Sequence, residues 1–422
     1  MADITLDEFR AEATAFLAAN SRLSDSDQKF VWGEGEDKVA LFDEKSAARE
    51  AAELAEAKQW RAKRYDAGLG WITGPREFGG RELPASYDRL YAGLEARYET
   101  PDQTFFGIGL GMVAPTLHAH ATDEVKQAYL ARLYRGELVA AQLFSEPGAG
   151  SDLAGLQTRA VRDGDEWLIT GQKVWTSGAH YCDIGEIICR TDPDQPKHRG
   201  LTGFVVDLRA PGVDIRPLRQ MTGGASFNEV FFNEVRVPDS HRLGDVNGGW
   251  TVALTTLMNE RASIGAGGSG GGLGLANTTR LAEMLRHFGL DRHPVYRQEL
   301  ARLYCAFQVA KFTNQRALDK IKAGQLPGPE LSTAKLALTD NLTATAQFIG
   351  RILGPRLTAD TGEWGTYAWT QFVLGTPGMR VAGGTDEVMK NIVGERVLGL
   401  PKDPGIDSKT PFRDLKVGTQ AG

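Results

Sequence analysis

The chain has 422 residues, 41% of them apolar, a length at which two or three packed domains are expected. Its net charge of -6 provides no basic surface for phosphate backbones, and no apolar stretch is long enough to span a bilayer, so we expect neither nucleic acid nor membrane as a partner. Three scattered cysteines without a Cys-x-x-Cys pair exclude a disulfide framework and favour a reducing, cytoplasmic location with no metal site.

Residues 1–136 have the pattern of a helical domain. Ala, Glu, Leu and Arg dominate, and apolar residues recur every three or four positions in segments such as SYDRLYAGLEARY and DEVKQAYLARLY. The first twenty residues also resemble an amphipathic helix rather than a secretory signal, because acids lie among the apolar positions.

Residues 137–245 change in character. Short runs rich in β-branched and aromatic residues, such as WLITGQKVWTS and NEVFFNEVRV, alternate with Gly, Pro and Asp turns and predict a compact β domain. Helical periodicity returns over residues 246–401, in VALTTLMNERASI and DEVMKNIVGERVL, and predicts a second helical bundle. The polar residues 402–422 are expected to form an extended arm or a loose end.

A glycine-rich turn lies in LFSEPGAGSDLAGL, residues 143–156. Glycines let a backbone approach a planar or charged ligand closely, although most such turns are plain turns. About twenty residues later, GQKVWTSGAHYCD places Trp175, Thr176 and Ser177 at the end of a predicted strand. An indole face and two hydroxyls could line a flavin ring there, whereas a Trp with polar neighbours is usually core packing. The two elements together are a stronger signal than either alone.

With a third segment, RVAGGTDEVMKNIVGERVLGLP at residues 380–401, these motifs resemble the acyl-CoA dehydrogenase family over nearly the whole chain. The resemblance implies an α+β multidomain fold: an N-terminal α-helical domain, a middle β-barrel domain and a C-terminal four-helix bundle. It implies FAD as cofactor, acyl-CoA as substrate and electron-transferring flavoprotein as electron acceptor. The cofactor-binding residues that it implies are Leu143, Phe144, Ser145, Gly150, Ser151, Trp175, Thr176, Ser177, Thr385 and Glu387, with Ser151 also near the thioester.

The family reaction needs a base that takes the proton α to the thioester carbonyl, and a carboxylate suits this when burial raises its pKa toward neutrality. At the common family position for this Glu, just before Gly-Thr, the chain has Gly383. A subset of the family places the Glu on an early helix of the C-terminal bundle, directly before an Arg, and Glu260 and Arg261 match that pattern. We therefore predict Glu260 as the catalytic base and Arg261 as a substrate contact. The alternative is a Glu paired with an Arg on a solvated helix face.

Two segments that contact a neighbouring subunit's FAD in most homotetrameric relatives are not clear in this chain. A similar pattern occurs in heteromeric members that oxidise steroid side-chain CoA thioesters, so both a homotetramer and an α2β2 heterotetramer with a related chain are open. The glycine run at residues 265–274 lacks the Lys and Ser or Thr of a phosphate loop. We expect it to break the helix that carries Glu260 and to make room for a bulky acyl group, steroid-like or branched.

Two other functions stay open beside acyl-CoA dehydrogenation in fatty acid or steroid degradation. A flavin oxidase or monooxygenase of the same fold would use another acid or a His as base and would consume oxygen. A supporting subunit would only complete the flavin site of a partner chain. Retention of both the β-domain motifs and Glu260 favours a catalytic chain.

Overall fold

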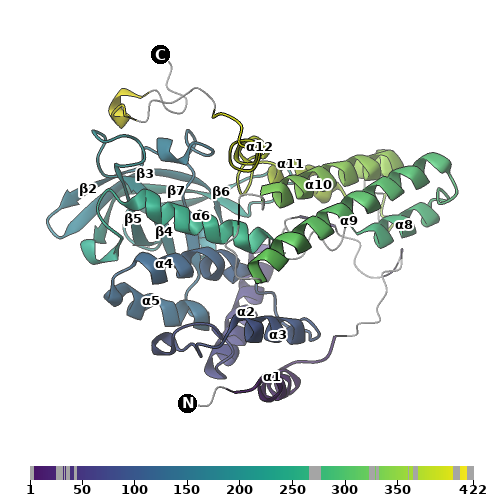
Figure 1. Ribbon diagram of the computed structural model, residues 1–422, viewed down its shortest axis with the longest axis horizontal. Helices are drawn as coiled ribbons and strands as arrows, with labels where there is room; N and C mark the ends of the chain where they lie inside the picture. The colour runs from purple at the N-terminus through teal and green to yellow at the C-terminus, as the bar shows by residue number, and fades with distance from the viewer. Residues whose placement is uncertain are drawn as a thin grey trace.

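The computed structural model describes residues 4–24, 32, 34, 39–41, 45–265, 277–322, 328, 332–359, 361–364, 369–402 and 409–415. Within these ranges the side chains of residues 261–265, 318 and 321–322 are not described. Helices form the two ends of the chain and strands form its middle, as Figure 1 shows.

The N-terminal helices lie beneath the β domain in the view of Figure 1. They are α1 (Leu6–Asn20), α2 (Ala47–Asp66), α3 (Ala85–Glu95), α4 (Ala114–His120) and α5 (Asp123–Arg135), with a π-helical turn at Gly109–Val113 before α4. Thr5 begins α1 with a capping box, because its hydroxyl accepts from the Glu8 N–H while the Glu8 carboxylate accepts from the Thr5 N–H. Phe9, Leu17 and Tyr91 are buried in the core that joins α1 to α3.

Eight strands make one sheet in the middle of the chain. They are β1 (Ala140–Leu143), β2 (Arg159–Asp163), β3 (Glu166–Ser177), β4 (Ile184–Arg190), β5 (Leu201–Asp207), β6 (Val213–Leu218), β7 (Phe227–Pro238) and β8 (Arg242–Leu243). Their order is β6-β7-β3-β2-β4-β5-β8, and β1 pairs in parallel with β4. The long strands β3 and β7 pair antiparallel, with register shifts between Ile169 and Gly171 and between Lys173 and Thr176.

This sheet has a buried inner face and an outer face that is covered at β4 and β5. On the inner face, side chains from β3, β4, β5 and β7 share one core that includes Trp167, Ile187, Phe204 and Val230, so the sheet curls around its own interior like a barrel. On the outer face, residues of β4 and β5 pack with α4 and the following helix α6 (Gly249–Gly265) in a second core. This second core joins all three parts of the chain.

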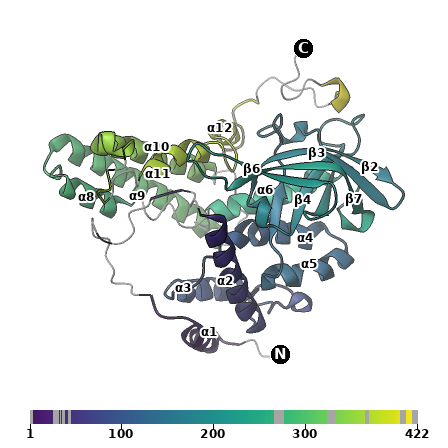
Figure 2. The same cartoon turned by 180° about the vertical axis from the view of Figure 1, so that it is seen from behind.

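The C-terminal helices extend away from the sheet, as both views show (Figures 1 and 2). After α6 they are α8 (Thr278–His287), α9 (Pro294–Lys322), α10 (Ser332–Leu353), α11 (Thr370–Met379) and α12 (Asp386–Ile392), followed by a π-helical turn at Val393–Val397. Their shared core contains Leu281, Leu342, Phe348 and Trp369. None of the helices that the structure describes is both long and apolar enough to cross a membrane.

The helical, β, helical order is confirmed, as is the expected fold class. The glycine run at residues 265–274 lies outside the described residues beyond Gly265, so its predicted role remains a prediction. Part of the tail, residues 409–415, is an ordered arm that lies against the β domain.

Candidate active site

The glycine-rich turn is fixed to strand β3 by its main chain. Leu143, the last residue of β1, and Phe144 are both buried, and the carbonyl of Ser145 accepts from the N–H of Val174 at 2.8 Å. The backbones of Glu146 and Ala149 then bond each other in both directions and close the turn. The structure therefore brings the predicted segment 143–146 directly beside the predicted segment 174–177.

A buried ion pair clamps the same two segments from inside. The ammonium of Lys173, which is fully buried, donates to the Glu146 carboxylate at 2.9 Å and to the Phe144 carbonyl at 3.0 Å. The Glu146 carboxylate also accepts from the N–H groups of Gln157 and Thr158. Desolvation opposes ionisation of Glu146, but the Lys173 charge and these hydrogen bonds outweigh it and hold the pKa of Glu146 below its ordinary value.

Trp175 has a strained backbone and an exposed ring. Its φ of 60° is in the left-handed region, which is rare for a bulky residue, and it lies within the β3–β7 register shift. The indole is 58% exposed and touches the Phe227 ring only edge to face, at a centroid distance of 6.1 Å. An exposed aromatic ring held by a strained bulge fits a stacking surface for a planar ligand better than it fits core packing.

The neighbouring hydroxyls are placed differently from each other. Thr176 is 1% exposed, and its Oγ1 is buried with no hydrogen-bond partner among the described residues. A buried hydroxyl without a partner costs free energy, so a ligand that bonds it would remove that cost. Ser177 is half-buried at the end of β3. The Trp175 ring and Ser177 are therefore open to a ligand, whereas the Thr176 hydroxyl is covered.

Gly150 and Ser151 are exposed at the far end of the turn. The next residue, Asp152, binds the ammonium of Lys197 at 2.7 Å, and that ammonium lies on the loop between β4 and β5. The Ser151 hydroxyl is therefore presented at the surface by a turn that the β4–β5 loop supports.

Glu260 is on α6, half-buried, one turn beyond Thr256. Arg261 is in the same helix, and its side chain lies outside the described part of the chain. Below Glu260, Thr256 is fully buried and donates to the Glu186 carboxyl of β4 at 2.6 Å. The Thr116 hydroxyl of α4 lies 2.9 Å from that of Thr256. This contact holds α6 to both the sheet and the N-terminal helices.

Glu186 has an unusual environment. It is fully buried, and its Oε2 has no hydrogen-bond partner among the described residues. Burial raises the pKa of Glu186 to about 8, while the hydrogen bond from Thr256 acts in the opposite direction. The carboxyl is therefore neutral in the folded protein at pH 7.

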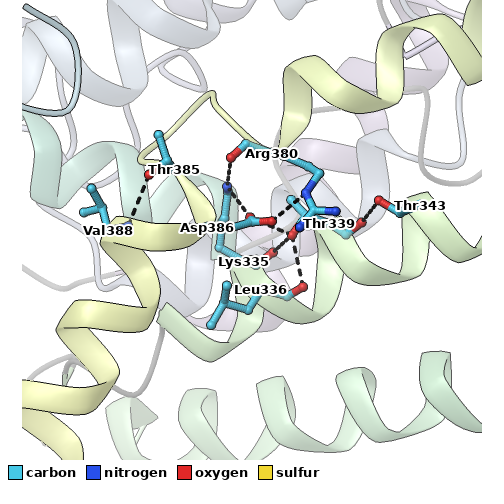
Figure 3. Close-up of polar contacts among 8 residues, drawn as sticks. All are labelled: Lys335, Leu336, Thr339, Thr343, Arg380, Thr385, Asp386 and Val388. Atoms are coloured by element: carbon cyan, nitrogen blue, oxygen red, sulfur yellow. Dashed lines mark hydrogen bonds and ion pairs between the residues drawn. The ribbon is translucent and has the colours of Figure 1, made fainter.

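The loop before α12 is held by a second buried acid, shown in Figure 3. The Asp386 carboxylate, 1% exposed, accepts from Lys335 at 3.0 Å, from Thr339 at 2.9 Å and from Arg380 at 2.8 Å. Desolvation opposes its ionisation, but these donors outweigh it and lower the pKa of Asp386. Asp386 therefore fixes both ends of the 380–385 loop to α10.

The predicted residues on this loop have unequal surroundings. Thr385 begins α12 by accepting from the Val388 N–H at 3.1 Å, and Glu387 is exposed in the first turn of that helix. Gly383, at the common family position of the base, has φ 66°, and Gly384 has φ 90°. Side chains rarely adopt a φ of 90°, so the backbone at Gly384 favours glycine.

Comparison with known proteins places these observations in a family. Three family models match in order: the N-terminal domain of acyl-CoA dehydrogenase over residues 34–137, the middle domain over 141–235 and the C-terminal domain over 247–398. The chain belongs to the acyl-CoA dehydrogenase family of oxidoreductases, whose members bind FAD.

Two relatives from Mycobacterium tuberculosis show how far the similarity extends. Acyl-CoA dehydrogenase IpdE1 is 33% identical over 94% of this chain and 98% of its own length. Acyl-CoA dehydrogenase FadE34 is 39% identical over 85% of this chain. The matched region is 48% of the length of FadE34, so this chain spans about half of that relative. Among solved structures, the Tcur3481-Tcur3483 steroid ACAD has a TM-score of 0.72 at 28% identity and covers 96% of this chain and 99% of its own.

Three charged residues that hold the site together were not identified from the sequence: Lys173, Glu186 and Asp386. Lys173 and Asp386 lie inside the segments that carry the family resemblance, and the resemblance assigns ligand contacts to their neighbours but no role to them. Glu186 had a signal of its own, since a single acid within the apolar strand IGEIICR indicates a buried carboxyl.

Proposed function

We propose that this chain catalyses FAD-dependent α,β-dehydrogenation of an acyl-CoA thioester. The observation that carries this proposal is the clamp between the 143–146 turn and the 173–176 segment, which presents the exposed Trp175 ring with the half-buried Ser177 close by in the chain. FAD, when bound, supplies the acceptor for the hydride that leaves carbon β.

The residues proposed to hold the flavin are those of the sequence motifs. They are Leu143, Phe144, Ser145, Gly150, Ser151, Trp175, Thr176 and Ser177 in the β domain and Thr385 and Glu387 at the start of α12. Ser151 and Arg261 are the proposed substrate contacts. Leu143 is fully buried and Phe144 is 6% exposed, so their proposed part is to support the turn from beneath.

Glu260 is the proposed base, which takes the proton from carbon α. It is partly withdrawn from water on α6, a helix that is anchored to the sheet one turn earlier through Thr256 and Glu186. A rigid support matters because proton transfer requires the carboxylate within hydrogen-bond reach of the reacting carbon. Gly383 has no carboxylate, which supports Glu260 over the more common position.

The test is anaerobic reduction of the bound flavin by acyl-CoA. Glu260→Gln should retain flavin and substrate binding but reduce the rate of flavin bleaching by at least about a thousandfold, the scale expected for loss of a general base. Glu283→Gln, an acid paired with Arg286 on the surface of α8, is the matched control and should reduce normally. Unchanged bleaching in Glu260→Gln would place the base elsewhere, and oxygen consumption without an acceptor would favour an oxidase.

A bulky acyl group is the proposed substrate class, steroid-like or branched. The support is the likeness to a protein described as a steroid ACAD and the glycine run that follows Glu260 in the sequence. A panel of CoA thioesters tests this directly. Faster bleaching by steroid side-chain or branched thioesters than by short straight chains is expected, and the reverse order would contradict it.

Assembly into a homotetramer or an α2β2 heterotetramer is proposed from an exposed apolar face on α9. Ala301, Cys305, Val309 and Phe312 recur at helical spacing on one side, with Val309 65% and Phe312 64% exposed. Native mass measurement of the chain alone and with a co-expressed related chain distinguishes the two assemblies. Electron-transferring flavoprotein is the proposed acceptor.

A further inference from the structure

The arm at residues 409–415 is bound to the β4–β5 loop of the β domain. Its backbone contacts are the Pro196–Pro411 bridge and the N–H groups of Phe412 and Arg413, which donate to the carbonyls of Gln195 at 2.9 Å and Pro193 at 3.0 Å. The Arg413 side chain pairs with Asp194. The arm therefore places residues that follow the C-terminal helices in sequence against the β domain (Figure 1).

Phe412 covers a buried arginine. Its ring is 9% exposed, and the guanidinium carbon of Arg190, at the end of β4, lies 3.7 Å from the ring centroid. Arg190 is itself 4% exposed, and desolvation lowers its pKa to about 10, which leaves it charged at neutral pH. A cation removed from water in this way gains most from an aromatic face, because no water screens the attraction.

The same guanidinium supports the substrate side of the glycine-rich turn. Arg190 Nη2 donates to the Ala154 carbonyl at 2.6 Å, three residues after Ser151. Its Nη1 donates to the Lys197 carbonyl at 2.7 Å, and the Lys197 ammonium binds Asp152. Arg190 therefore reaches the 151–156 segment both directly and through Lys197.

We propose that Phe412 and Arg190 are positioning residues for acyl-CoA: the arm closes over Arg190, and Arg190 holds the 151–156 segment that presents Ser151. This inference rests on the proposed function for its substrate. The flavin side of the turn has a support of its own in Lys173, which binds the Phe144 carbonyl and the Glu146 carboxylate, and that carboxylate also accepts from the N–H groups of Gln157 and Thr158, just beyond the 151–156 segment. Loss of the arm contact should therefore weaken substrate binding while it leaves flavin content and the chemical step intact.

The test compares three variants of the full-length flavin-loaded protein. Phe412→Ala removes the ring, and Phe412→Tyr restores an aromatic face. Phe231→Ala is the matched control, because the Phe231 ring of β7 also lies against an arginine: the guanidinium carbon of Arg216, on β6, is 4.6 Å from the ring centroid. In Phe412→Ala we expect hydrogen exchange of the amides in residues 153–156 to accelerate at least about fivefold and the KM for acyl-CoA to rise by a similar factor. The kcat should not change, Phe412→Tyr should resemble the wild type, and Phe231→Ala should change neither quantity.

Equal exchange rates in Phe412→Ala and Phe231→Ala would overturn the proposal, as would an unchanged KM or a fall in kcat at constant KM. Failure of the proposed function has a different signature. In that case the wild type would not be reduced by any acyl-CoA, while the exchange comparison would still decide whether the arm holds the 151–156 segment.

Discussion

Glu186 should make this protein less stable as the pH rises, and replacing it with glutamine should abolish that dependence. The carboxyl is fully buried, and burial raises its pKa from the ordinary 4.5 to about 8. A carboxyl with a raised pKa in the folded state contributes its full stability below the unfolded pKa, and that contribution is lost as the pH rises toward the folded pKa. The sensitive window is therefore about pH 4.5 to 8.

The size of the effect follows from the two pKa values. At 1.36 kcal/mol per pH unit, the interval between 4.5 and about 8 corresponds to about 5 kcal/mol, and the slope within it is about 1.4 kcal/mol per pH unit. Glutamine has nearly the same shape, can still accept from Thr256 and does not titrate. The free energy of unfolding of Glu186→Gln relative to wild type should therefore increase steadily with pH.

The assay is urea unfolding of both proteins at several pH values from 5 to 8, followed by tryptophan fluorescence. Taking the difference between the two proteins at each pH removes the titration of every other group. The expected result is the smallest difference near pH 5 and a difference larger by about 4 kcal/mol at pH 8. Parallel pH profiles would refute the reasoning, because they would mean that Glu186 ionises in the folded protein as easily as in the unfolded chain.

Two further predictions concern the clamp around the flavin segments. Lys173→Met should destabilise the protein by about 3 to 5 kcal/mol in urea unfolding, because it leaves the Glu146 carboxylate buried without its cation, and adding Glu146→Gln should recover much of that loss. Trp175→Gly should leave the apoprotein as stable or about 1 kcal/mol more stable, because glycine adopts φ 60° without strain, yet the variant should retain less flavin after gel filtration. Equal flavin retention would remove Trp175 from the cofactor site.

The arrangement of domains was predictable because hydrophobic periodicity is a local property. A helical pattern over residues 1–136, alternating β-rich runs over 137–245 and a second helical pattern after 246 are each visible in short windows of sequence. The proximity of the two β-domain motifs was also predictable, but only from the family resemblance.

The support of the site was not predictable from local patterns. The backbone conformation of Trp175 depends on the shift in pairing register between β3 and β7. The Arg190–Phe412 contact joins the end of strand β4 to the tail of the chain. Such pairings are decided by tertiary packing, which single-sequence periodicity does not contain. The tail is an example. Its polar composition allowed both an extended arm and a loose end, and the burial of the Phe412 ring against Arg190 holds residues 409–415 as an arm.

The location of the proposed base has a physical consequence for rigidity. An acid at position 383 would stand in a loop where positions 383 and 384 have positive φ, and Asp386, at the start of α12, ties that loop to Lys335 of α10. Glu260 instead stands on α6, which packs on the sheet that also carries Trp175. If Glu260 is the base and Trp175 part of the flavin surface, as proposed, both stand on elements of one packed unit. The Thr256–Glu186 contact ties α6 to this sheet, while position 383, which then needs no carboxylate, is a glycine with φ 66° in the loop that leads into α12.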